Sequence, residues 1–363
     1  MKYYIIAGEA SGDLHGSNLI KALKKQESQL DIRAWGGDLM ANEGANIIKH
    51  YRDLAFMGFI EVIMNIRTIA KNLKFCKSDI LDYKPDALIL IDYPGFNLRI
   101  AEFAKQHNIP VHYYISPTVW AWKSSRVFQV KKNVDQMFCI LPFEPDFYKK
   151  YDYDAHYVGH PLLDAIASTP TEDVIKKHDK KTIALLPGSR NQEIKKILPT
   201  MVKVVRAFPD YHFKLAVAPS MSIALIKSYI GDAPIELIQG KTYDVIKSAD
   251  LALVTSGTAT LETALFNVPE IVCYKTSYFS YLIGRMLVKV KYISLVNLIM
   301  DDRVVPEYIQ EKCIEKALIE EINALIDGPK REQMLTKYAQ LHKTLGSGGA
   351  SLKVAQLITN FHK

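Results

Sequence analysis

The chain has 363 residues, enough for two domains of ordinary size, and its 48% hydrophobic and 23% charged residues exclude a disordered or collagen-like protein. Its net charge of +7 suits an anionic partner such as a nucleotide, a phosphosugar, a nucleic acid or an acidic membrane surface, although a lysine-rich surface without such a partner has the same excess. The sequence starts without a signal-peptide pattern, and it lacks the apolar run of about 20 residues that a membrane-spanning helix needs.

Short apolar runs alternate with helical patterns along the chain, which predicts parallel sheets covered by helices. In the first half, the predicted strands are residues 3–7, 87–91, 111–115, 136–141 and 156–158. In the second half, they are residues 182–186, 213–217, 235–238, 251–255 and 270–274. Each half opens with a strand, a tight loop and a helix start, so we expect two Rossmann-like α/β domains that face each other across a cleft.

The polar stretch 167–181 marks the predicted domain boundary. We expect an N-terminal domain of residues 1–167 and a C-terminal domain of residues 168–345. A glycine-rich segment, 345–349, comes next. The helix predicted at about 350–363 is expected to return to the first domain.

The first predicted strand ends in a loop with two carboxylates and a hydroxyl, those of Glu9, Asp13 and Ser11. The glycines of this loop, Gly8 and Gly12, do not have the G-x-G-x-x-G spacing of dinucleotide-binding loops. Ligands of open α/β sheets bind beyond the carboxyl ends of the strands. These side chains are therefore candidates for the wall of a substrate cleft.

Residues 57–77 have the pattern of an amphipathic helix. Its apolar positions are Met57, Phe59, Ile60, Ile63, Met64, Ile66, Ala70 and Leu73. Its basic stripe consists of Arg67, Lys71 and Lys74. Such a helix fits a membrane-surface segment or an acyl-chain site, and a core helix with one solvated face has a similar pattern.

Asp92 directly follows strand 87–91, which is apolar at every position. A carboxylate placed there, at the cleft and with little solvent, has a raised pKa that suits a general base. The alternative is that Asp92 caps the helix that starts near Phe96.

Two tryptophans, Trp120 and Trp122, follow strand 111–115, and Lys123 and Arg126 come shortly after them. Aromatic faces and cations suit sugars and phosphates. Structural packing also explains paired tryptophans.

The sequence shows no spacing typical of a metal site. Asp152 and Asp154 have the spacing of a metal–diphosphate motif, but they lie in a turn rich in tyrosine and aspartate. His156 and His160 lack the glutamate and the helix of a zinc protease. We therefore expect neither a metal nor another cofactor.

The second domain opens with a turn suited to phosphate. Gly188, Ser189 and Arg190 follow its first strand, and an arginine there can neutralise a diphosphate through paired hydrogen bonds. A turn with a solvated arginine is the alternative. Residues 240–242 resemble the end of a P-loop, but Ile235 stands where a P-loop has its first glycine.

A second such turn follows strand 251–255. Ser256, Gly257 and Thr258 open a helix, where free N–H groups and the helix dipole attract an anion. We expect Gly257 to let a phosphate approach the backbone and Thr258 to cap the helix. Glu262 is expected to accept hydrogen bonds from ribose hydroxyls. An ordinary helix start is the alternative for this turn alone, and the two turns together favour a nucleotide diphosphate.

Nine segments occur in the order in which they occur in lipid-A-disaccharide synthases. They are residues 8–13, 57–62, 91–97, 116–122, 141–144, 158–161, 186–190, 256–262 and 294–298. The chain resembles this family over nearly its whole length, most distinctively at 92–97 and 120–122.

The resemblance implies an inverting glycosyltransferase of the GT-B type. The family joins UDP-2,3-diacylglucosamine to 2,3-diacylglucosamine 1-phosphate, which gives a β-1,6-linked disaccharide 1-phosphate and UDP. It also implies a cytoplasmic protein that lies peripherally on the cytoplasmic face of the inner membrane, with anionic lipids and no nucleic acid as partners. The oligomeric state stays open.

The family's essential aspartate and arginine fall on Asp92 and Arg190. Many members carry an acidic residue where this chain has Gly95, which concentrates the base role on Asp92. The residues expected to bind UDP are Gly188, Ser189, Arg190, Ser256, Gly257, Thr258, Glu262 and Asn297. Those expected on the acceptor side are Glu9, Ser11, Asp13, Asn97, Ser116, Trp120, Trp122, Lys123 and Arg126.

Two other functions are weighed against this one. A UDP-N-acetylglucosamine 2-epimerase has the same architecture, but it needs no lipid acceptor and gives the helix at 57–77 no purpose. A non-catalytic nucleotide- or RNA-binding protein would suit the charge of +7, but the basic residues are scattered rather than interleaved with exposed aromatic residues.

Overall fold

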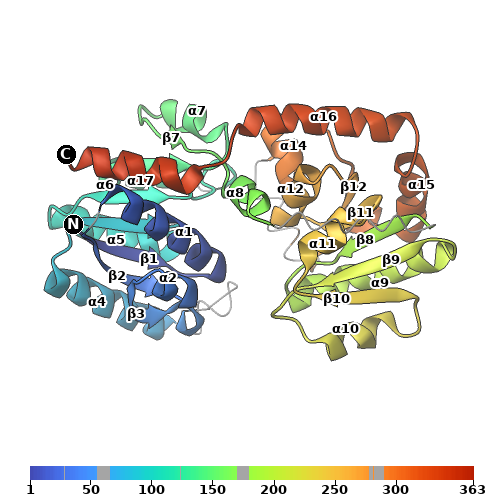
Figure 1. Cartoon of the computed structure of the whole chain (residues 1–363), viewed down its shortest axis with the longest axis horizontal. Coiled ribbons are helices and arrows are strands. Elements are labelled where there is room, and N and C mark those ends of the chain that lie inside the picture. Colours follow the sequence, from blue (N-terminus) through green and yellow to red (C-terminus); the bar gives the residue numbers. More distant parts are fainter. Residues whose placement is uncertain (28, 55–65, 123, 170–179, 278–280, 282–289) are drawn as a thin grey trace. The chain divides into compact units, whose positions relative to one another are not determined.

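The computed structural model describes residues 1–27, 29–54, 66–122, 124–169, 180–277, 281 and 290–363. The chain divides into two compact units (Figure 1). Unit 1 consists of Met1–Ala167 and Ser347–Lys363, and unit 2 consists of Ser168–Gly346. Each unit is built around one parallel sheet with helices on both faces, as the alternating pattern predicts.

Unit 1 contains a sheet of seven parallel strands. In sheet order they are β3 (Asn46–His50), β2 (Asp31–Gly36), β1 (Lys2–Ala7), β4 (Ala87–Ile91), β5 (Val111–Tyr114), β6 (Gln136–Cys139) and β7 (His156–Tyr157). The sequence analysis did not find β2 and β3, because charged and polar residues interrupt their apolar runs. The strand order reverses between β1 and β4, and loops beyond such a switch point commonly bind ligands.

Helices cover both faces of this sheet. One face carries α1 (Ala10–Gln26) and α17 (Ala350–Phe361), which lie side by side in Figure 1, and the other carries α4 (Ile66–Tyr83), α5 (Pro94–Gln106) and α6 (Arg126–Asn133). Alternate residues of β1 serve the two faces: Tyr3 and Ile5 pack toward α1 and α17, and Tyr4 and Ile6 pack toward α4 and α5. The remaining short elements of unit 1 are α2 (Asp38–Asn42), η1 (Tyr51–Asp53), α7 (Glu144–Lys149) and α8 (Pro161–Ala167).

The return of the chain to unit 1 is fixed by a carboxylate at the start of α17. Asp164 in α8 accepts hydrogen bonds from the backbone N–H groups of Gly349 and Ala350. An acidic side chain at a helix N-terminus satisfies free donors and complements the helix dipole.

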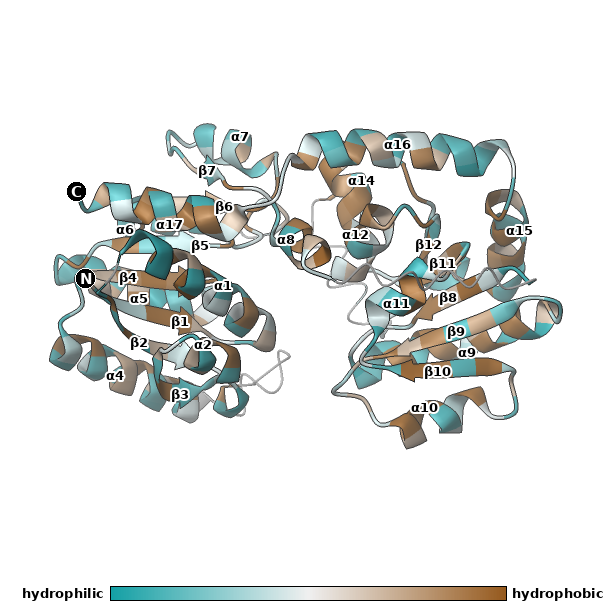
Figure 2. Ribbon diagram, viewed as in Figure 1, coloured by the Kyte–Doolittle hydropathy of each residue, from teal (hydrophilic) through white to brown (hydrophobic). Residues whose placement is uncertain are grey.

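Unit 2 contains a sheet of six parallel strands. In sheet order they are β10 (Ile235–Gln239), β9 (His212–Val217), β8 (Thr182–Leu186), β11 (Leu251–Thr255), β12 (Glu270–Tyr274) and β13 (Glu307–Ile309). The strand β13 has only three residues, and the sequence analysis missed it. The helical elements are α9 (Asn191–Ala207), α10 (Ile223–Ile230), α11 (Thr242–Lys247), α12 (Thr258–Leu265), α14 (Leu295–Met300), η2 (Gln310–Lys312), α15 (Glu315–Leu325) and α16 (Pro329–Leu345). The central strands of the sheets are mostly hydrophobic, whereas the helices alternate between hydrophobic and hydrophilic residues (Figure 2).

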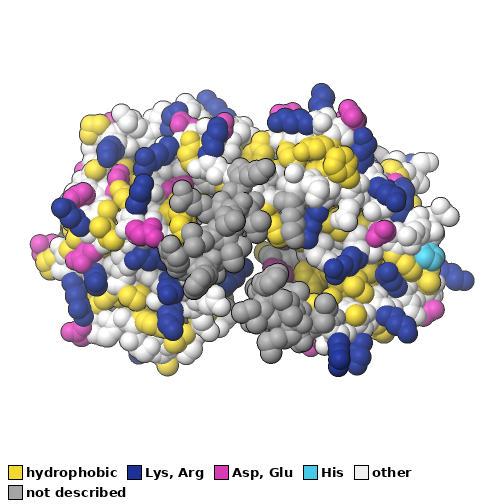
Figure 3. Space-filling model, turned by 180° about the vertical axis from the view of Figure 1, so that it is seen from behind, with side chains coloured by type: hydrophobic (Ala, Val, Ile, Leu, Met, Phe, Trp, Pro, Cys, Tyr) yellow, Lys and Arg dark blue, Asp and Glu magenta, His cyan; other side chains and the backbone are white. Residues whose placement is uncertain are grey.

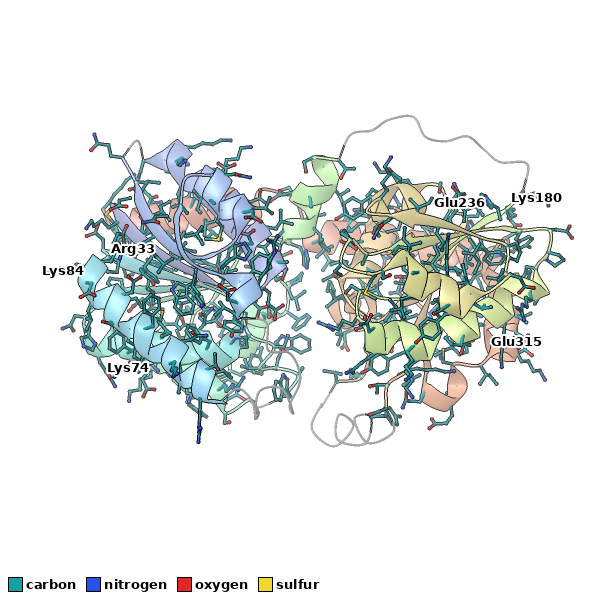
Figure 4. The ribbon with its side chains drawn as sticks, turned by 90° about the horizontal axis from the view of Figure 1, so that it is seen from below. Arg33, Lys74, Lys84, Lys180, Glu236 and Glu315 are labelled. Atoms are coloured by element: carbon teal, nitrogen blue, oxygen red, sulfur yellow. The ribbon has the colours of Figure 1, made fainter. Side chains whose placement is uncertain are left out.

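The helix predicted at 57–77 is described only from Ile66 onward, as α4. It ends at Tyr83 rather than at Lys77, because Cys76, Ile80 and Tyr83 continue the buried face at helical spacing. Lys74 lies on the outer side of α4 (Figure 4). In the described part of the chain, no helix is long and apolar enough to cross a membrane.

Candidate active site

The two turns predicted to bind phosphate line one cavity of about 420 Å³ in unit 2. They meet because β8 and β11 are neighbours, with Leu186 paired to Val254, so both strands end at the same edge of the sheet. Seven of the residues expected to bind UDP line this cavity: Gly188, Ser189, Arg190, Ser256, Gly257, Thr258 and Glu262. The cavity is of the size that small ligands occupy in proteins.

Glu193 organises the first turn, and the sequence analysis missed it. Its carboxylate accepts hydrogen bonds from the N–H groups of Ser189 (3.2 Å) and Arg190 (3.3 Å) and from the Arg190 guanidinium (3.1 Å). The backbone of Gly188 has φ +107°, and a Cβ there would collide with Glu193. A glutamate three residues into a helix is a known capping signal, and it was visible in the sequence.

Arg190 itself is accessible, with 64% of its side chain exposed. A pair between Arg190 and Glu193 at this exposure is screened by solvent and holds the arginine only weakly. The guanidinium is therefore free to turn toward an anion in the cavity.

The second turn opens helix α12 with a glycine at the cavity. Gly257 is the N-cap of α12, and a Cβ there would meet no atom within 4 Å, so packing does not require a glycine. The expectation that Thr258 caps this helix is wrong: Thr258 is its first residue, and no side chain caps it. The Ser256 hydroxyl donates to the carbonyl of Ile293 (2.8 Å), which fixes the turn.

Glu262 lies on the cavity wall, one turn into α12. Burial raises the pKa of its carboxyl, and the hydroxyl of Tyr243, which donates to it at 3.1 Å, lowers that pKa. Thr242 lines the same cavity. The sequence analysis dismissed residues 240–242 because they do not form a P-loop, and it thereby missed a wall residue of the site.

Asn297 was expected to bind UDP, but it is not among the residues that line the unit 2 cavity. Its side chain is fully buried. The amide nitrogen donates to Val305 O and Glu307 Oε1, and the amide oxygen accepts from the N–H groups of Val304 and Val305. All of its hydrogen-bonding capacity is used, so it supports the loop after α14 rather than contacting a nucleotide.

Asp92 ends the central strand β4 of unit 1 in an unusual backbone conformation. Asp92 and Tyr93 have φ of +45° and +51°, a region that costs free energy for any residue other than glycine. The carbonyl of Asp92 is held by the hydroxyl of Tyr113 (2.6 Å) and the side-chain amide of Asn97 (2.7 Å). Helix α5 begins at Pro94 with Tyr93 as its N-cap and has no side-chain cap, so the alternative that Asp92 caps this helix is wrong.

The carboxyl of Asp92 has a pKa raised to about 6. Burial is the main cause, the nearby carboxylate of Glu9 adds to it, and the N–H of Tyr93 opposes it. A carboxyl group with this pKa is ionised at neutral pH and still binds a proton readily, which is what a general base requires.

Several residues expected on the acceptor side serve the fold instead. Asp13 is 3% exposed, and its carboxylate accepts three backbone N–H bonds, from Gly37, Leu39 and Met40. Asn97 is fully buried behind the Asp92 carbonyl. In contrast, Ser11 is exposed and Glu9 is half-buried.

The tryptophan segment is anchored by Glu144, which the sequence analysis did not single out. Its carboxylate accepts from Trp120 Nε1 (3.1 Å) and from the N–H of Leu141 (3.0 Å). Its burial raises the pKa of Glu144 to about 7. Ser116 is also buried, 2.9 Å from the hydroxyl of Tyr148. Trp120 and Ser116 therefore have structural contacts.

Trp122 and Arg126 are the accessible part of this segment. The Trp122 side chain is 37% exposed, and the Arg126 guanidinium lies 5.5 Å from the centroid of its ring. Lys123 lies outside the described residues, as do Met57, Phe59, Ile60 and Ile63 of the expected lipid-facing helix, and the side chain of Ile66 is not described. Arg67, Lys71 and Lys74 are exposed.

The described residues hold no group of three or more His, Cys, Asp and Glu side chains that could bind a metal ion, and the metal-free expectation stays a prediction. Lys and Arg side chains are spread over both units, with Asp and Glu among them, on the face seen in Figure 3. This distribution differs from the single basic stripe typical of nucleic-acid-binding proteins.

Comparisons with known sequences point to one family. The family model described as lipid-A-disaccharide synthetase matches residues 3–359. The lipid-A-disaccharide synthase of Syntrophus aciditrophicus is 41% identical over 364 residues, with 97% of this chain and 95% of the relative covered. That of Myxococcus xanthus is 38% identical, with 98% of this chain and 96% of the relative covered.

Solved structures with similar folds include UDP-GlcNAc 2-epimerases and glycosyltransferases. UDP-GlcNAc 2-epimerase from Neisseria meningitidis, in a structure with bound UDP-GlcNAc, matches with a TM-score of 0.67 at 13% identity, covering 99% of this chain and 100% of its own. The glycotransferase of kitacinnamycin matches with a TM-score of 0.66 at 12% identity, covering 99% and 98%. The predicted fold class, with two Rossmann-like domains as in GT-B glycosyltransferases, is confirmed.

Proposed function

The chain belongs to the lipid-A-disaccharide synthase family, and from this premise we propose that it transfers a hexosyl group from UDP-2,3-diacylglucosamine to 2,3-diacylglucosamine 1-phosphate. The observation that carries the proposal is the unit 2 cavity, in which two phosphate-suited turns meet. The epimerase alternative shares only the fold, at 13% identity, whereas the synthases share 38–41% of their residues over nearly the whole chain.

In this proposal, unit 2 binds the UDP part of the donor. Residues 256–258 line the cavity at the N-terminus of α12, where free backbone N–H groups suit the diphosphate. Arg190 releases Glu193 and pairs with the β-phosphate. Glu262, which already accepts a hydrogen bond from the Tyr243 hydroxyl, accepts another from a ribose hydroxyl.

Asp92 is proposed as the general base. Its carboxylate takes the proton of the acceptor's 6-hydroxyl while that oxygen forms a bond to the donor's anomeric carbon. The bond between this carbon and the UDP oxygen breaks, and its electron pair leaves with UDP. One displacement without a covalent intermediate inverts the anomeric configuration.

The negative charge that grows on the β-phosphate requires a positive partner. We propose that Arg190 and the α12 N-terminus fill this role without a metal ion or another cofactor, because preorganised donors in a site stabilise a developing charge efficiently. Full activity in the presence of a strong chelator is the expected result. An activity that a chelator removes and a divalent cation restores would contradict it.

The membrane location is also a proposal. Both substrates carry acyl chains, and α4 exposes Arg67, Lys71 and Lys74 beside Phe75, which is 49% exposed. A basic face with apolar residues suits the cytoplasmic surface of an anionic inner membrane. Charge reversal of these three cations to glutamate is expected to weaken cosedimentation with phosphatidylglycerol vesicles, whereas the same reversal of Lys21, Lys24 and Lys25 on α1 is the matched control.

The decisive experiment for the function is a transfer assay. Purified protein is incubated with both substrates, and UDP and the disaccharide 1-phosphate are measured together. Equal amounts of both products are expected. The donor is also incubated alone: its conversion to an epimer, without any disaccharide when the acceptor is present, would favour the epimerase instead.

A further inference from the structure

A second cavity, of about 490 Å³, lies in unit 1 directly beside the Asp92 loop. Residues of α4, α5 and α6 line it, together with the segment from Tyr93 to Phe96. Any molecule held there has one part next to the residue that follows Asp92. The cavity therefore lies one residue away from Asp92, close to where an acceptor has to present its hydroxyl if Asp92 is the base.

The wall of this cavity is apolar on one side. Ile69 of α4 and Phe96 and Leu98 of α5 contribute to it, and Phe96 and Leu98 also belong to the hydrophobic core. Gly95 adds open space, because a Cβ there would meet no atom within 4 Å. Such a wall suits an acyl chain or the apolar face of a sugar.

The other side of the cavity is cationic. Arg99 and Arg126 line it, and Glu102 is the carboxylate among its described lining residues. Within the parts of the chain that the structure describes, neither arginine forms a salt bridge, whereas Arg33 and Arg52 of the same unit pair with Asp79 and Asp38. Two guanidinium groups without a carboxylate partner, at the edge of an apolar cavity, suit an amphiphile with an anionic head.

We propose that this cavity binds the phosphate monoester of the acylated acceptor, with Arg99 and Arg126 as the groups that contact the phosphate. This inference rests on the proposed function, from which it takes the acceptor. A guanidinium fork matches the oxygens of a phosphate, and a phosphate monoester carries close to two negative charges at neutral pH. The two arginines thus make the enzyme selective for an acceptor that carries its 1-phosphate.

The main test compares two acceptors, short-chain 2,3-diacylglucosamine 1-phosphate and the same sugar without phosphate. Arg99→Gln and Arg126→Gln are each expected to raise the acceptor KM by about tenfold to a hundredfold, the range that loss of a charge-assisted hydrogen bond produces. The preference for the phosphorylated over the dephosphorylated acceptor should fall by a similar factor, whereas the KM for the donor, which unit 2 is proposed to bind, should stay at the wild-type level. Arg52→Gln, the same change outside the cavity, is the matched control.

A binding measurement separates this inference from the proposed function. The full chain is titrated with both acceptor sugars by calorimetry in the absence of donor. Phosphate-dependent binding that both variants weaken supports the cavity even if no disaccharide is formed, in which case only the proposed function fails. Transfer activity with undiminished preference for the phosphorylated acceptor in both variants overturns the inference and leaves the proposed function intact.

Phosphate can also come from the membrane. The variants are therefore compared in cosedimentation with phosphatidylglycerol vesicles. Unchanged vesicle binding is expected, because a lipid diester offers a single charge. If Arg99→Gln and Arg126→Gln lose vesicle binding but keep their preference for the phosphorylated acceptor, the cavity is a lipid head-group site and the inference is wrong.

Discussion

The proposed donor site of unit 2 and the proposed base site of unit 1 use opposite physical means. In unit 2, the cavity is formed by backbone turns, and its arginine is 64% exposed. In unit 1, the proposed base is a largely buried aspartate in a left-handed conformation, with its carbonyl held by Tyr113 and Asn97. The proposed donor site recognises negative charge that the ligand brings. The proposed base site instead keeps the pKa of its own carboxyl group raised.

This difference follows from what each site has to do. A diphosphate arrives fully ionised, so free N–H groups and a mobile arginine are sufficient to bind it. A carboxylate is a weak base in water, and burial with a like charge nearby is needed to raise its pKa toward neutrality. We therefore expect substitution of Arg190 in unit 2 to act on activity alone, and substitution of Asp92 to change activity and stability in opposite directions.

The largest effect is expected for Asp92→Asn. Loss of a general base lowers kcat by about 10²- to 10⁴-fold. Because the folded pKa of about 6 lies above the ordinary value of 3.8 for an aspartate, the ionised form is disfavoured in the fold, and the stability that the protonated form contributes is lost as pH rises through about 6. Asparagine mimics the protonated form, so the variant should be more stable at pH 8 by about 1–3 kcal/mol.

Kinetics and thermal unfolding at pH 8 and pH 4 test this expectation. The stability difference should vanish at pH 4, where Asp92 is protonated in the fold. Asp154→Asn, on the exposed turn of unit 1, is the control. A variant that keeps near-normal turnover, or loses stability at pH 8, would show that Asp92 is not a buried base.

Arg190→Ala is expected to come second. Removal of one group that stabilises a developing charge lowers kcat by about 10²- to 10³-fold. Its pair with Glu193 is exposed, so the free energy of unfolding should change by less than about 1 kcal/mol. Arg206→Ala is the matched control, since Arg206 is 61% exposed and also pairs with a carboxylate, that of Asp232. If Arg190→Ala lowered the free energy of unfolding by as much as it raised the activation free energy, the contrast between the two sites would not hold.

The two cavity glycines sharpen the same contrast within unit 2. Gly257→Ala should raise the donor KM by about tenfold, because its Cβ enters open cavity space. Its stability should stay within about 0.5 kcal/mol of wild type. Gly188→Ala should destabilise the protein by about 1–3 kcal/mol, because the backbone is at φ +107° and Glu193 blocks the Cβ. Donor titration and chemical denaturation of both variants distinguish the two cases.

The sequence predicted the parts of the site that follow from local pattern and topology. A strand, a small-residue turn and a helix start are local features, and parallel neighbours in a sheet bring their carboxyl ends together. This is why the turns after β8 and β11 were expected to cooperate before their contact was known. The buried environment of Asp92 followed in the same way from the apolar strand before it.

The direction of polar side chains was harder to predict. Asp13, Asn97 and Asn297 lie in motif segments, but their side chains bind backbone groups, because buried N–H and C=O groups need partners. Pattern alone does not tell whether a polar residue satisfies the fold or faces a ligand. Thr242 was missed for the converse reason, because it joins the cavity through a contact that spacing does not reveal. Glu193 was missed although its position three residues into α9 is a capping signal.

The smallest effect is expected for Glu9, whose negative charge is the second cause of the raised pKa of Asp92. A base with a raised pKa is active only when deprotonated, so kcat/KM should rise with pH to a plateau, with a midpoint near the pKa of about 6. Glu9 adds its negative charge to the effect of burial, and Glu9→Gln removes this charge at nearly constant size. The midpoint should therefore move to lower pH, by about half a unit, while burial maintains the rest of the shift. Glu43→Gln, at a half-buried position in a turn of unit 1, is the control. An unchanged midpoint in Glu9→Gln would mean that burial alone raises the pKa of Asp92. A midpoint at higher pH would show that the loss of kcat/KM at low pH is caused by the protonation of another group.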